Sequence, residues 1–342
     1  MTGSVRVVEV GADRGLVTVE RELAQPGQGQ VLLDVAFCGI CGSDLHFRDV
    51  PELFPAGTVP GHELSGRVAE LGPGVTGWDV GDRVSVLPFA QCGECERCLA
   101  GEEQVCPYAV PNGVGLGTGR AGAYAQRMLA DARMLFALPD EVDDRAGTFA
   151  EPLAVAVRAV EKAALGPDEP VAVLGAGPIG LLTSLVLREN GHERFVLVSR
   201  NRGRAEHAAA LGLPTVLLAD AETGVPDALG AAPTCVFECA GSPSAARLAV
   251  ELVQPLGRVM LVGMSLEPLD LAAPPILIKE LDLRGVIAYR RADFARAIEL
   301  LASGRIPTDQ LITGTAPLDD AEAMFQALTA PGNQHVKVLL EP

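Results

Sequence analysis

Lysine is scarce in this sequence. The 342 residues include only three lysines (Lys162, Lys279 and Lys337), and the formal net charge is −17. A surface that binds nucleic-acid phosphates needs clustered Lys and Arg, so this composition disfavours a nucleic-acid partner. No basic segment followed by an apolar one opens the chain, and the apolar runs are shorter than the roughly 20 residues of a membrane span. We therefore expect a cytoplasmic protein with no nucleic-acid or membrane partner.

Internal repeats and low-complexity segments are also absent, but the chain changes character along its length. In the first half, short apolar runs broken by Gly and Pro, such as 31–37 and 81–89, predict a small, irregular β domain. From about residue 150, strand-like runs such as 171–175 alternate with helix-like runs such as 179–190, which is typical of an α/β fold with a doubly wound parallel sheet. The length of the chain favours two domains.

The stretch "VLGAGPIG" carries a GxGxxG pattern between a predicted strand and a predicted helix. Gly175 suits a tight turn, Gly177 lets a pyrophosphate approach, and Gly180 lets the helix pack closely on the strand. Pro178 and Ile179 are expected to contact the cofactor, and the helix that follows offers free N–H groups to the phosphates. A turn without a ligand is the alternative, but the strand–turn–helix context favours a dinucleotide site.

The end of the next predicted strand bears on which nicotinamide cofactor binds. An NAD site usually carries Asp or Glu there, whereas this chain has Ser199 followed by Arg200, Arg202 and Arg204. A hydroxyl beside a guanidinium can bind a 2′-phosphate that a carboxylate would repel. NADP(H) is therefore favoured over NAD(H), the alternative being a solvated arginine loop that tolerates NAD.

Two further motifs, "CGICGSDLH" at 38–46 and "GHE" at 61–63, complete a family resemblance. Together with the GxGxxG pattern and a four-cysteine segment, in this order along essentially the whole chain, they resemble the zinc-dependent medium-chain dehydrogenases, particularly the polyol and threonine dehydrogenase branch. The resemblance implies a GroES-like catalytic domain (1–148 and 287–342) and a Rossmann dinucleotide-binding domain (149–286). It also implies further cofactor contacts at Val262, Gly263 and Met264.

The same resemblance implies a catalytic zinc ion held by Cys41 and His62. Glu63 is expected as a third ligand that exchanges with water, and Glu151 matches a position where the polyol branch carries a glutamate. Thiolate, imidazole and carboxylate all suit zinc, and a catalytic site keeps one position open. Which of the two glutamates ligates at rest stays open, and Glu151 before a proline could instead favour a helix start.

Three neighbours of these ligands have implied roles. Asp44 resembles the carboxylate that orients the ligating histidine. Ser43 and His46 match a hydroxyl-and-imidazole relay that passes the substrate's proton to solvent. His46 could alternatively be an ordinary surface histidine.

Four of the eight cysteines fall within fifteen positions: Cys92, Cys95, Cys98 and Cys106. An iron–sulfur cluster is one interpretation, but a ferredoxin run has a shorter final spacing and usually a second copy. A nucleic-acid zinc knuckle needs basic neighbours, whereas this loop holds several glutamates. What remains, and what the resemblance also implies, is a closed structural zinc site in a lobe at about 90–108.

The expected protein is thus a zinc-dependent, NADP(H)-preferring oxidoreductase that interconverts a secondary alcohol or polyol and its ketone. It should carry two zinc ions per chain, act on a small molecule and, by resemblance, form a homodimer or homotetramer. The alternatives are a zinc-free quinone reductase on the same scaffold and, in another class, an iron–sulfur electron carrier.

Overall fold

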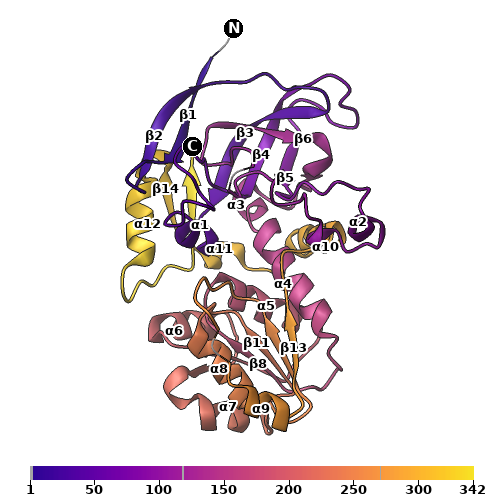
Figure 1. Ribbon diagram of the computed structural model, residues 1–342, viewed down its shortest axis with the longest axis vertical. Helices are drawn as coiled ribbons and strands as arrows, with labels where there is room; N and C mark the ends of the chain where they lie inside the picture. The colour runs from indigo at the N-terminus through magenta and orange to yellow at the C-terminus, as the bar shows by residue number, and fades with distance from the viewer. Residues whose placement is uncertain (1–2, 118, 270) are drawn as a thin grey trace. The chain divides into compact units, whose positions relative to one another are not determined.

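The computed structural model describes residues 3–117, 119–269 and 271–342 (Figure 1). Its contacts divide the chain into two compact units. One comprises Met1–Glu151 and Arg290–Pro342, and the other comprises Pro152–Tyr289. Within the described part of the chain, no helix combines the length and apolar character needed to cross a membrane.

The first unit is built on a seven-stranded sheet of order β14-β15-β3-β4-β5-β7, with β6 also paired to β3 and a separate β1-β2 hairpin. The long central strand β3 pairs with several neighbours and carries Val31, Leu32 and Leu33 near its start, all fully buried. The strands are β1 (Ser4–Val10), β2 (Leu16–Glu22), β3 (Gln30–Gly39), β4 (Glu63–Leu71), β5 (Arg83–Val86), β6 (Arg127–Asp131), β7 (Leu135–Ala137), β14 (Ile312–Pro317) and β15 (Lys337–Glu341).

Short helices complete this unit. Helix α10 buries Phe294 and Ala297 on one face, and the Asp293 carboxylate accepts the N–H of Arg290 (2.7 Å), which caps its first turn. The helices are α1 (Gly42–Phe47), α2 (Glu96–Leu99), α3 (Asp144–Gly147), α10 (Arg291–Ala302), α11 (Thr308–Leu311), α12 (Ala321–Thr329), η1 (Glu103–Val105), η2 (Ala132–Met134) and η4 (Leu318–Asp320). Helix α4 (Ala150–Ala163) starts in this unit and continues into the second.

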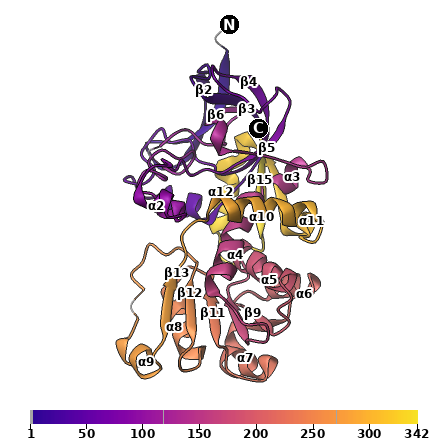
Figure 2. The same ribbon diagram turned by 90° about the vertical axis from the view of Figure 1, so that its right-hand side faces the viewer.

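The second unit is a six-stranded parallel sheet of order β10-β9-β8-β11-β12-β13, flanked by helices (Figure 2). The doubly wound sheet predicted from the alternating pattern is confirmed. Its strands are β8 (Val171–Leu174), β9 (Phe195–Ser199), β10 (Thr215–Leu217), β11 (Cys235–Glu238), β12 (Arg258–Leu261) and β13 (Asp282–Gly285). Its helices are α5 (Pro178–Glu189), α6 (Arg202–Ala210), α7 (Ala221–Leu229), α8 (Pro243–Leu252), α9 (Ala273–Ile278) and η3 (Leu218–Asp220).

The strand order of this sheet positions a binding crevice. Strands β8, β9 and β11 are buried along their whole length, as expected of strands covered on both faces. From β8 the chain first builds outward through β9 and β10, and then returns to the other side through β11 and β12. Ligands of such sheets bind at the carboxyl ends of the strands where the order reverses, here at β8 and β11.

Two of the three lysines bind backbone carbonyls in this unit. Lys279 donates from Nζ to the carbonyls of Val250, Glu251 and Val253 at 2.7–3.0 Å, which satisfies the end of α8. Lys162 donates from Nζ to the carbonyl at the end of β13 at 2.7 Å. Neither side chain is fully exposed.

Candidate functional site

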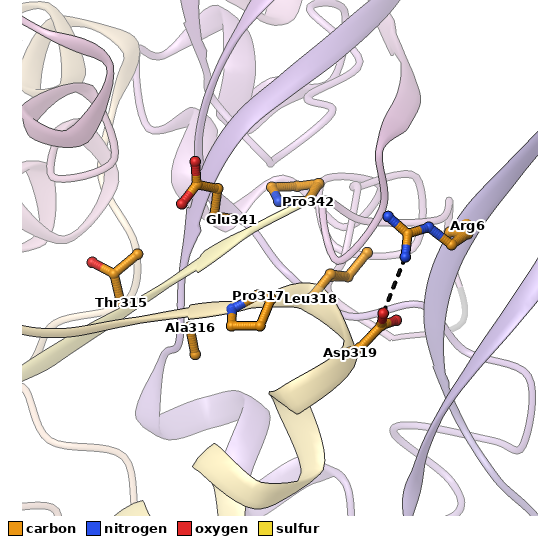
Figure 3. Close-up of a pocket in the computed structure, with 8 residues that line it drawn as sticks. All are labelled: Arg6, Thr315, Ala316, Pro317, Leu318, Asp319, Glu341 and Pro342. Atoms are coloured by element: carbon orange, nitrogen blue, oxygen red, sulfur yellow. Dashed lines mark hydrogen bonds and ion pairs between the residues drawn. The ribbon is translucent and has the colours of Figure 1, made fainter.

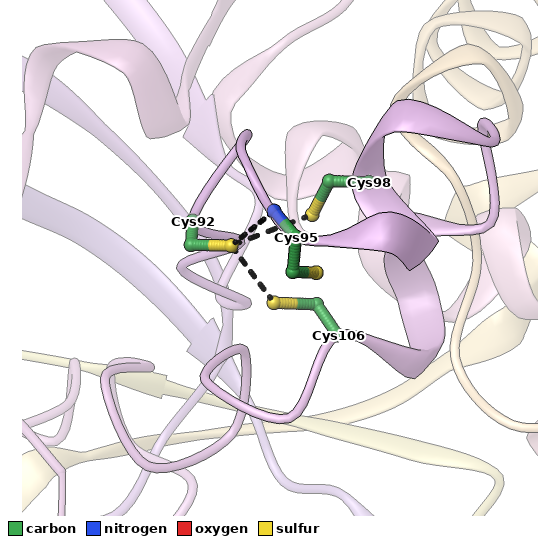
Figure 4. Close-up of side chains that lie close together, drawn as sticks. All are labelled: Cys92, Cys95, Cys98 and Cys106. Carbon is green, nitrogen blue, oxygen red and sulfur yellow. Dashed lines mark hydrogen bonds between the residues drawn. The ribbon is translucent and has the colours of Figure 1, made fainter.

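Four cysteine side chains converge in the lobe after β5 (Figure 4). The Sγ atoms of Cys92, Cys95, Cys98 and Cys106 all lie within 4.8 Å of one another. Cys92 Sγ is 3.9 Å from Cys98 Sγ and 3.7 Å from Cys106 Sγ, and all four are free thiols. Sulfurs bound tetrahedrally to zinc at about 2.3 Å lie about 3.8 Å apart. The spacing therefore fits a zinc ion bound by four thiolates.

The backbone of this lobe prepares the thiols for a metal. Gly93 has a φ of 80°, a left-handed turn that brings Cys95 N–H to 3.3 Å from Cys92 Sγ. Hydrogen bonds from the backbone of Glu94 and then of Cys95 lower the pKa of Cys92 to about 7, while burial raises the pKa of Cys98 to about 12. A metal ion favours the thiolate form of all four.

The cysteine lobe is tied to the rest of the first unit through Glu103. Its carboxylate accepts the N–H of Arg291, at the start of α10, at 2.6 Å. The guanidinium of Arg291 in turn lies 4.7 Å from the ring centroid of Phe136. The cysteine lobe therefore caps the start of α10 when it is folded. A metal ion that holds the lobe together would also stabilise this helix contact.

A second set of polar side chains meets where β3 and β4 pair and β15 begins. Gly39 lies opposite Glu63 on β4 and opposite Leu339 on β15. This register brings Lys337 Nζ to the Glu63 carboxylate and to the carbonyl of Ile40 (3.2 Å), and both charged side chains are only 2% exposed. A Cβ at position 39 would collide with Glu63, so the close approach requires glycine.

The Cys41–His62 pair lies beside this buried ion pair. Asp44, fully buried on α1, places Oδ1 3.4 Å from His62 Nδ1. Its Oδ2 accepts hydrogen bonds from Cys41 N (3.1 Å) and from the buried Tyr124 hydroxyl (2.9 Å). Ser43 Oγ is 3.5 Å from the other ring nitrogen, Nε2. A carboxylate that faces one imidazole nitrogen leaves the other for a metal.

The charges at this place favour a cation. Burial lowers the pKa of His62, but Asp44 and Cys41 outweigh it, so the pKa is raised well above its ordinary value. Burial also lowers the pKa of Lys337, and the charges of Glu63, Cys41 and Glu151 outweigh that effect and raise it. The anionic groups that hold protons on these two residues would equally attract a zinc ion.

The two remaining residues expected here are less tightly placed. Glu151 is 6% exposed at the start of α4, and its charge acts on Lys337. His46 is exposed on the last turn of α1. Within the described residues, only the cysteine lobe brings three or more ligand atoms within 4.8 Å of one another, so the Cys41–His62 set is a more open arrangement.

The glycine-rich loop of the second unit adopts the expected strand–turn–helix path. Gly175 follows β8 with a φ of 109°, and Gly177 and Pro178 occupy the N-cap and first position of α5. A Cβ on Gly180 would collide with the carbonyl of Gly175, so helix and strand approach as closely as glycine allows. Ile179 follows in the same first turn, whose N–H groups are free to bind an anion.

The end of β9 differs in detail from what its sequence suggests. Ser199 is only 1% exposed, and its hydroxyl donates to the carbonyl of Asn201 at 2.8 Å. Arg200 is exposed. Arg204 lies over the loop, with Nη1 4.0 Å from the Cβ position of Gly177, and burial and then Arg200 lower its pKa. The guanidinium groups of Arg200 and Arg204 therefore lie near each other beyond the end of β9.

The loops after β11 and β12 form the other side of the crevice. Val262 and Gly263 each donate a backbone N–H to the carbonyl of Glu238, at 2.9 and 2.8 Å, and Met264 is exposed. Glu238 itself is 1% exposed.

Three residues of these sites were not predicted from the sequence: Lys337, Tyr124 and Glu238. Lys337 carried one signal, a charge inside the apolar run "HVKVLL". Tyr124 and Glu238 lie in stretches without a motif, and only the fold brings the Tyr124 hydroxyl to Asp44 and Glu238 to the loops after β11 and β12.

A cavity of about 370 Å³ lies elsewhere in the first unit (Figure 3), lined by residues 315–319 with Arg6 and Glu341. Arg6 Nη1 is 3.0 Å from Asp319 Oδ2 across it. None of its lining residues belongs to the four-cysteine lobe or to the Cys41–His62 set, so we do not assign this cavity a role in their chemistry.

Comparisons with known proteins agree with this geometry. Residues 27–140 match the alcohol dehydrogenase GroES-like domain, and residues 178–303 match the zinc-binding dehydrogenase family. The predicted GroES-like β-rich domain joined to a Rossmann domain is thereby confirmed.

Individual relatives are similar over almost the whole chain. A 2-dehydro-3-deoxy-L-galactonate 5-dehydrogenase of Pseudoalteromonas atlantica is 36% identical over 94% of each chain. A sorbitol dehydrogenase of Halalkalibacterium halodurans is 31% identical over 94% of each. The crystal structure of a zinc-binding dehydrogenase from Sinorhizobium meliloti bound to NADP has a TM-score of 0.89, with 28% identity over 99% of this chain and 100% of that one.

Proposed function

We propose a specific reaction on one premise: the chain belongs to the zinc-dependent medium-chain dehydrogenases, in their polyol dehydrogenase branch. It is an oxidoreductase that interconverts an alcohol or polyol and its ketone. The finer proposal is an NADP(H)-preferring enzyme for a secondary alcohol or polyol, with two zinc ions per chain, active as a homo-oligomer in the cytoplasm. The observation that carries the catalytic zinc site of this proposal is the environment of His62, which a buried carboxylate orients and which lies close to Cys41.

In this proposal Cys41, His62 and a glutamate hold the catalytic zinc. Zinc there supplies Lewis-acid chemistry, and the nicotinamide supplies the hydride chemistry. Asp44 fixes the orientation of the imidazole. Ser43, 3.5 Å from His62 Nε2, accepts the substrate's hydroxyl proton and passes it toward solvent by way of His46.

The buried Lys337 favours one of the two candidate glutamates as the zinc ligand. Its ammonium group is hydrogen-bonded to Glu63 in a site closed to water, so moving that carboxylate to a metal would leave a buried cation unpaired. Glu151 lies in the same neighbourhood, since its charge helps to raise the pKa of Lys337. We therefore assign Glu151 as the third ligand in the resting enzyme and Glu63 as a charge that Lys337 holds in place.

The NADP(H) preference rests on the arginine pair beyond β9. Arg204 lies over Gly177, where the pyrophosphate is expected, and Arg200 is close enough to lower its pKa. Two guanidinium groups near one point favour a doubly charged 2′-phosphate. Because the Ser199 hydroxyl is used internally, we assign the phosphate contact to the arginines and give Ser199 the smaller role of leaving space without negative charge.

The homo-oligomer proposal has support in the second unit. Strand β13 is an edge strand of the sheet. Near it lie large exposed apolar side chains: Leu256 (74%), Leu277 (72%) and Ile278 (82%). An edge strand and an apolar patch of this kind favour association with a second copy.

Metal analysis combined with a cofactor and substrate panel tests the proposal. We expect two zinc ions per chain, no iron or acid-labile sulfide, and turnover of secondary alcohols or polyols that is faster with NADP+ than with NAD+. Activity on quinones without zinc, or an iron–sulfur absorption band, would replace it with one of the two alternatives.

A further inference from the structure

Glu238 ends β11 as a carboxylate that the catalytic chemistry does not use. Its Oε1 accepts the N–H groups of Ala240 (2.9 Å) and Gly241 (2.8 Å) in the loop that follows the strand. Burial raises the pKa of this carboxyl group, and backbone hydrogen bonds from Gly241, Ala240 and Ser242 oppose that rise. Burying an acid without partners is costly, and here the backbone N–H groups of the loop supply those partners, so the carboxylate fixes the path of the loop.

The same residue also holds the neighbouring loop. Its backbone carbonyl accepts the N–H groups of Val262 and Gly263, the first two residues after β12. Its Oε2 lies only 3.0 Å from where a Cβ on Gly263 would be, so the absence of a side chain at Gly263 makes room for the carboxylate. Glu238 thus contacts the loops after both β11 and β12, one through its side chain and one through its backbone.

These loops leave no spare room around Glu238. A Cβ on Gly241, whose φ is 64°, would collide with the carbonyl of Met264, and a Cβ on Gly263 would collide with Gly241. On the other side, the Cβ position of Gly175 is 2.9 Å from Ala240 N. The loops after β8, β11 and β12 therefore form one packed layer along the carboxyl edge of the sheet.

In a doubly wound sheet, each half of a dinucleotide lies over one half of the strands. The adenosine half belongs over β8 and β9, and the nicotinamide half over β11 and β12. We propose that Glu238 is a positioning residue for the nicotinamide half of the cofactor, acting through the loops after β11 and β12. This inference rests on the proposed dinucleotide function.

Binding of two ligands to the wild-type enzyme and to Glu238→Gln tests it. The amide keeps the shape and can keep its oxygen at the Oε1 position, but it removes the negative charge and puts an NH2 group at the Oε2 position beside Gly263. We expect the Kd of NADPH to rise by about tenfold, because hydrogen bonds to a charged group are weakened. Adenosine 2′,5′-bisphosphate, which lacks the nicotinamide half, should keep its Kd within about twofold, because its expected contacts lie over β8 and β9.

Glu169→Gln is the matched control. This carboxylate belongs to the same unit but lies at the amino ends of β11 and β12, where it pairs with Arg258 and Thr234. Its loss should lower the thermal midpoint and leave both Kd values unchanged. If Glu238→Gln does not fold, Glu238→Asp, which keeps the charge one methylene closer to the backbone, makes the same comparison.

The outcomes separate the inference from its premise. A selective loss of NADPH affinity supports the positioning role, as does a rise in KM for NADPH larger than that for the alcohol substrate. Equal losses for both ligands, or none, overturn the role while leaving the dinucleotide function intact. Failure of the wild-type enzyme to bind either ligand overturns the dinucleotide function itself.

Discussion

Removing Lys337 should strongly destabilise the first unit. Its ammonium group and the Glu63 carboxylate are both 2% exposed, so neither can be solvated if its partner is lost. Breaking one side of a buried ion pair costs about 3–5 kcal/mol, whereas removing both charges is often close to neutral. We expect Lys337→Met to lose about 3–5 kcal/mol of unfolding free energy, since it leaves Glu63 uncompensated among other acidic groups.

A double-mutant cycle isolates this interaction. Glu63→Gln alone should cost a similar amount, because it leaves the lysine unpaired. The double variant should be more stable than the sum of the two losses predicts by about 2–4 kcal/mol, because each single variant already carries the penalty of the orphaned partner.

The chain offers a convenient probe for the measurement. Trp78 is the only tryptophan and packs against the core of the first unit, so its fluorescence in denaturant follows that unit. Zinc must be held at one concentration throughout, since bound metal adds to apparent stability.

The exposed pair Arg296–Glu299, 46% and 66% accessible, is the control, and its loss should cost less than about 1 kcal/mol. Strictly additive losses at Lys337 and Glu63 would refute the reasoning.

Further expectations follow from the other sites. Cys98→Ser should lose one zinc and much of the stability, whereas Cys41→Ser should abolish turnover in a folded protein; reversed phenotypes would mean that the two sites exchange roles. Ser199→Asp should shift kcat/KM from NADP+ toward NAD+ by roughly ten- to hundredfold, as expected for about 1.5–3 kcal/mol of charge-assisted contact, and no shift would reject the NADP assignment. Tyr124→Phe removes a hydrogen bond to Asp44, the carboxylate that faces the proposed zinc ligand His62, so chelator competition should show about tenfold weaker zinc binding, and unchanged affinity would contradict that role. Because the pKa of Glu238 is raised above its ordinary value of 4.5, the folded chain holds more protons than the unfolded one, and the free energy of unfolding should fall as pH rises from that value through the raised pKa. Glu238→Gln should lack this part of the pH dependence. If urea titrations gave the same change of unfolding free energy with pH for the wild type and the variant, the prediction would be wrong.

Local patterns in the sequence predicted much of the fold. The run "VAVLG" predicted the strand β8 because a strand covered on both faces needs continuous apolar residues. The stretch that begins at Ile179 predicted α5, which the structure starts one residue earlier at Pro178. Spacing alone also identified the four-cysteine lobe, since its ligands lie close together in the chain.

Contacts between distant segments could not be predicted in this way. Lys337 and Glu63 are 274 positions apart, and Tyr124 and Asp44 are 80 apart. The meeting of Lys337 and Glu63 depends on the register of β15 and β4 against β3, which no local pattern encodes. The partner of the Ser199 hydroxyl could not be predicted either, because its hydrogen bond to the carbonyl of Asn201 depends on how the loop turns after β9.

The placement of the lysines has a practical consequence for handling the protein. Lys162 and Lys279 donate to backbone carbonyls, Lys337 is buried in an ion pair, and none of the three is fully exposed. Amine-reactive dyes, crosslinkers and resins need an accessible, uncharged amine, so the folded enzyme should label poorly at its lysines. The 44 aspartates and glutamates offer a far denser set of attachment points, which makes carbodiimide coupling through carboxylates the better route to immobilisation. A sudden gain in lysine labelling would in turn report local opening of the segments that these side chains hold together.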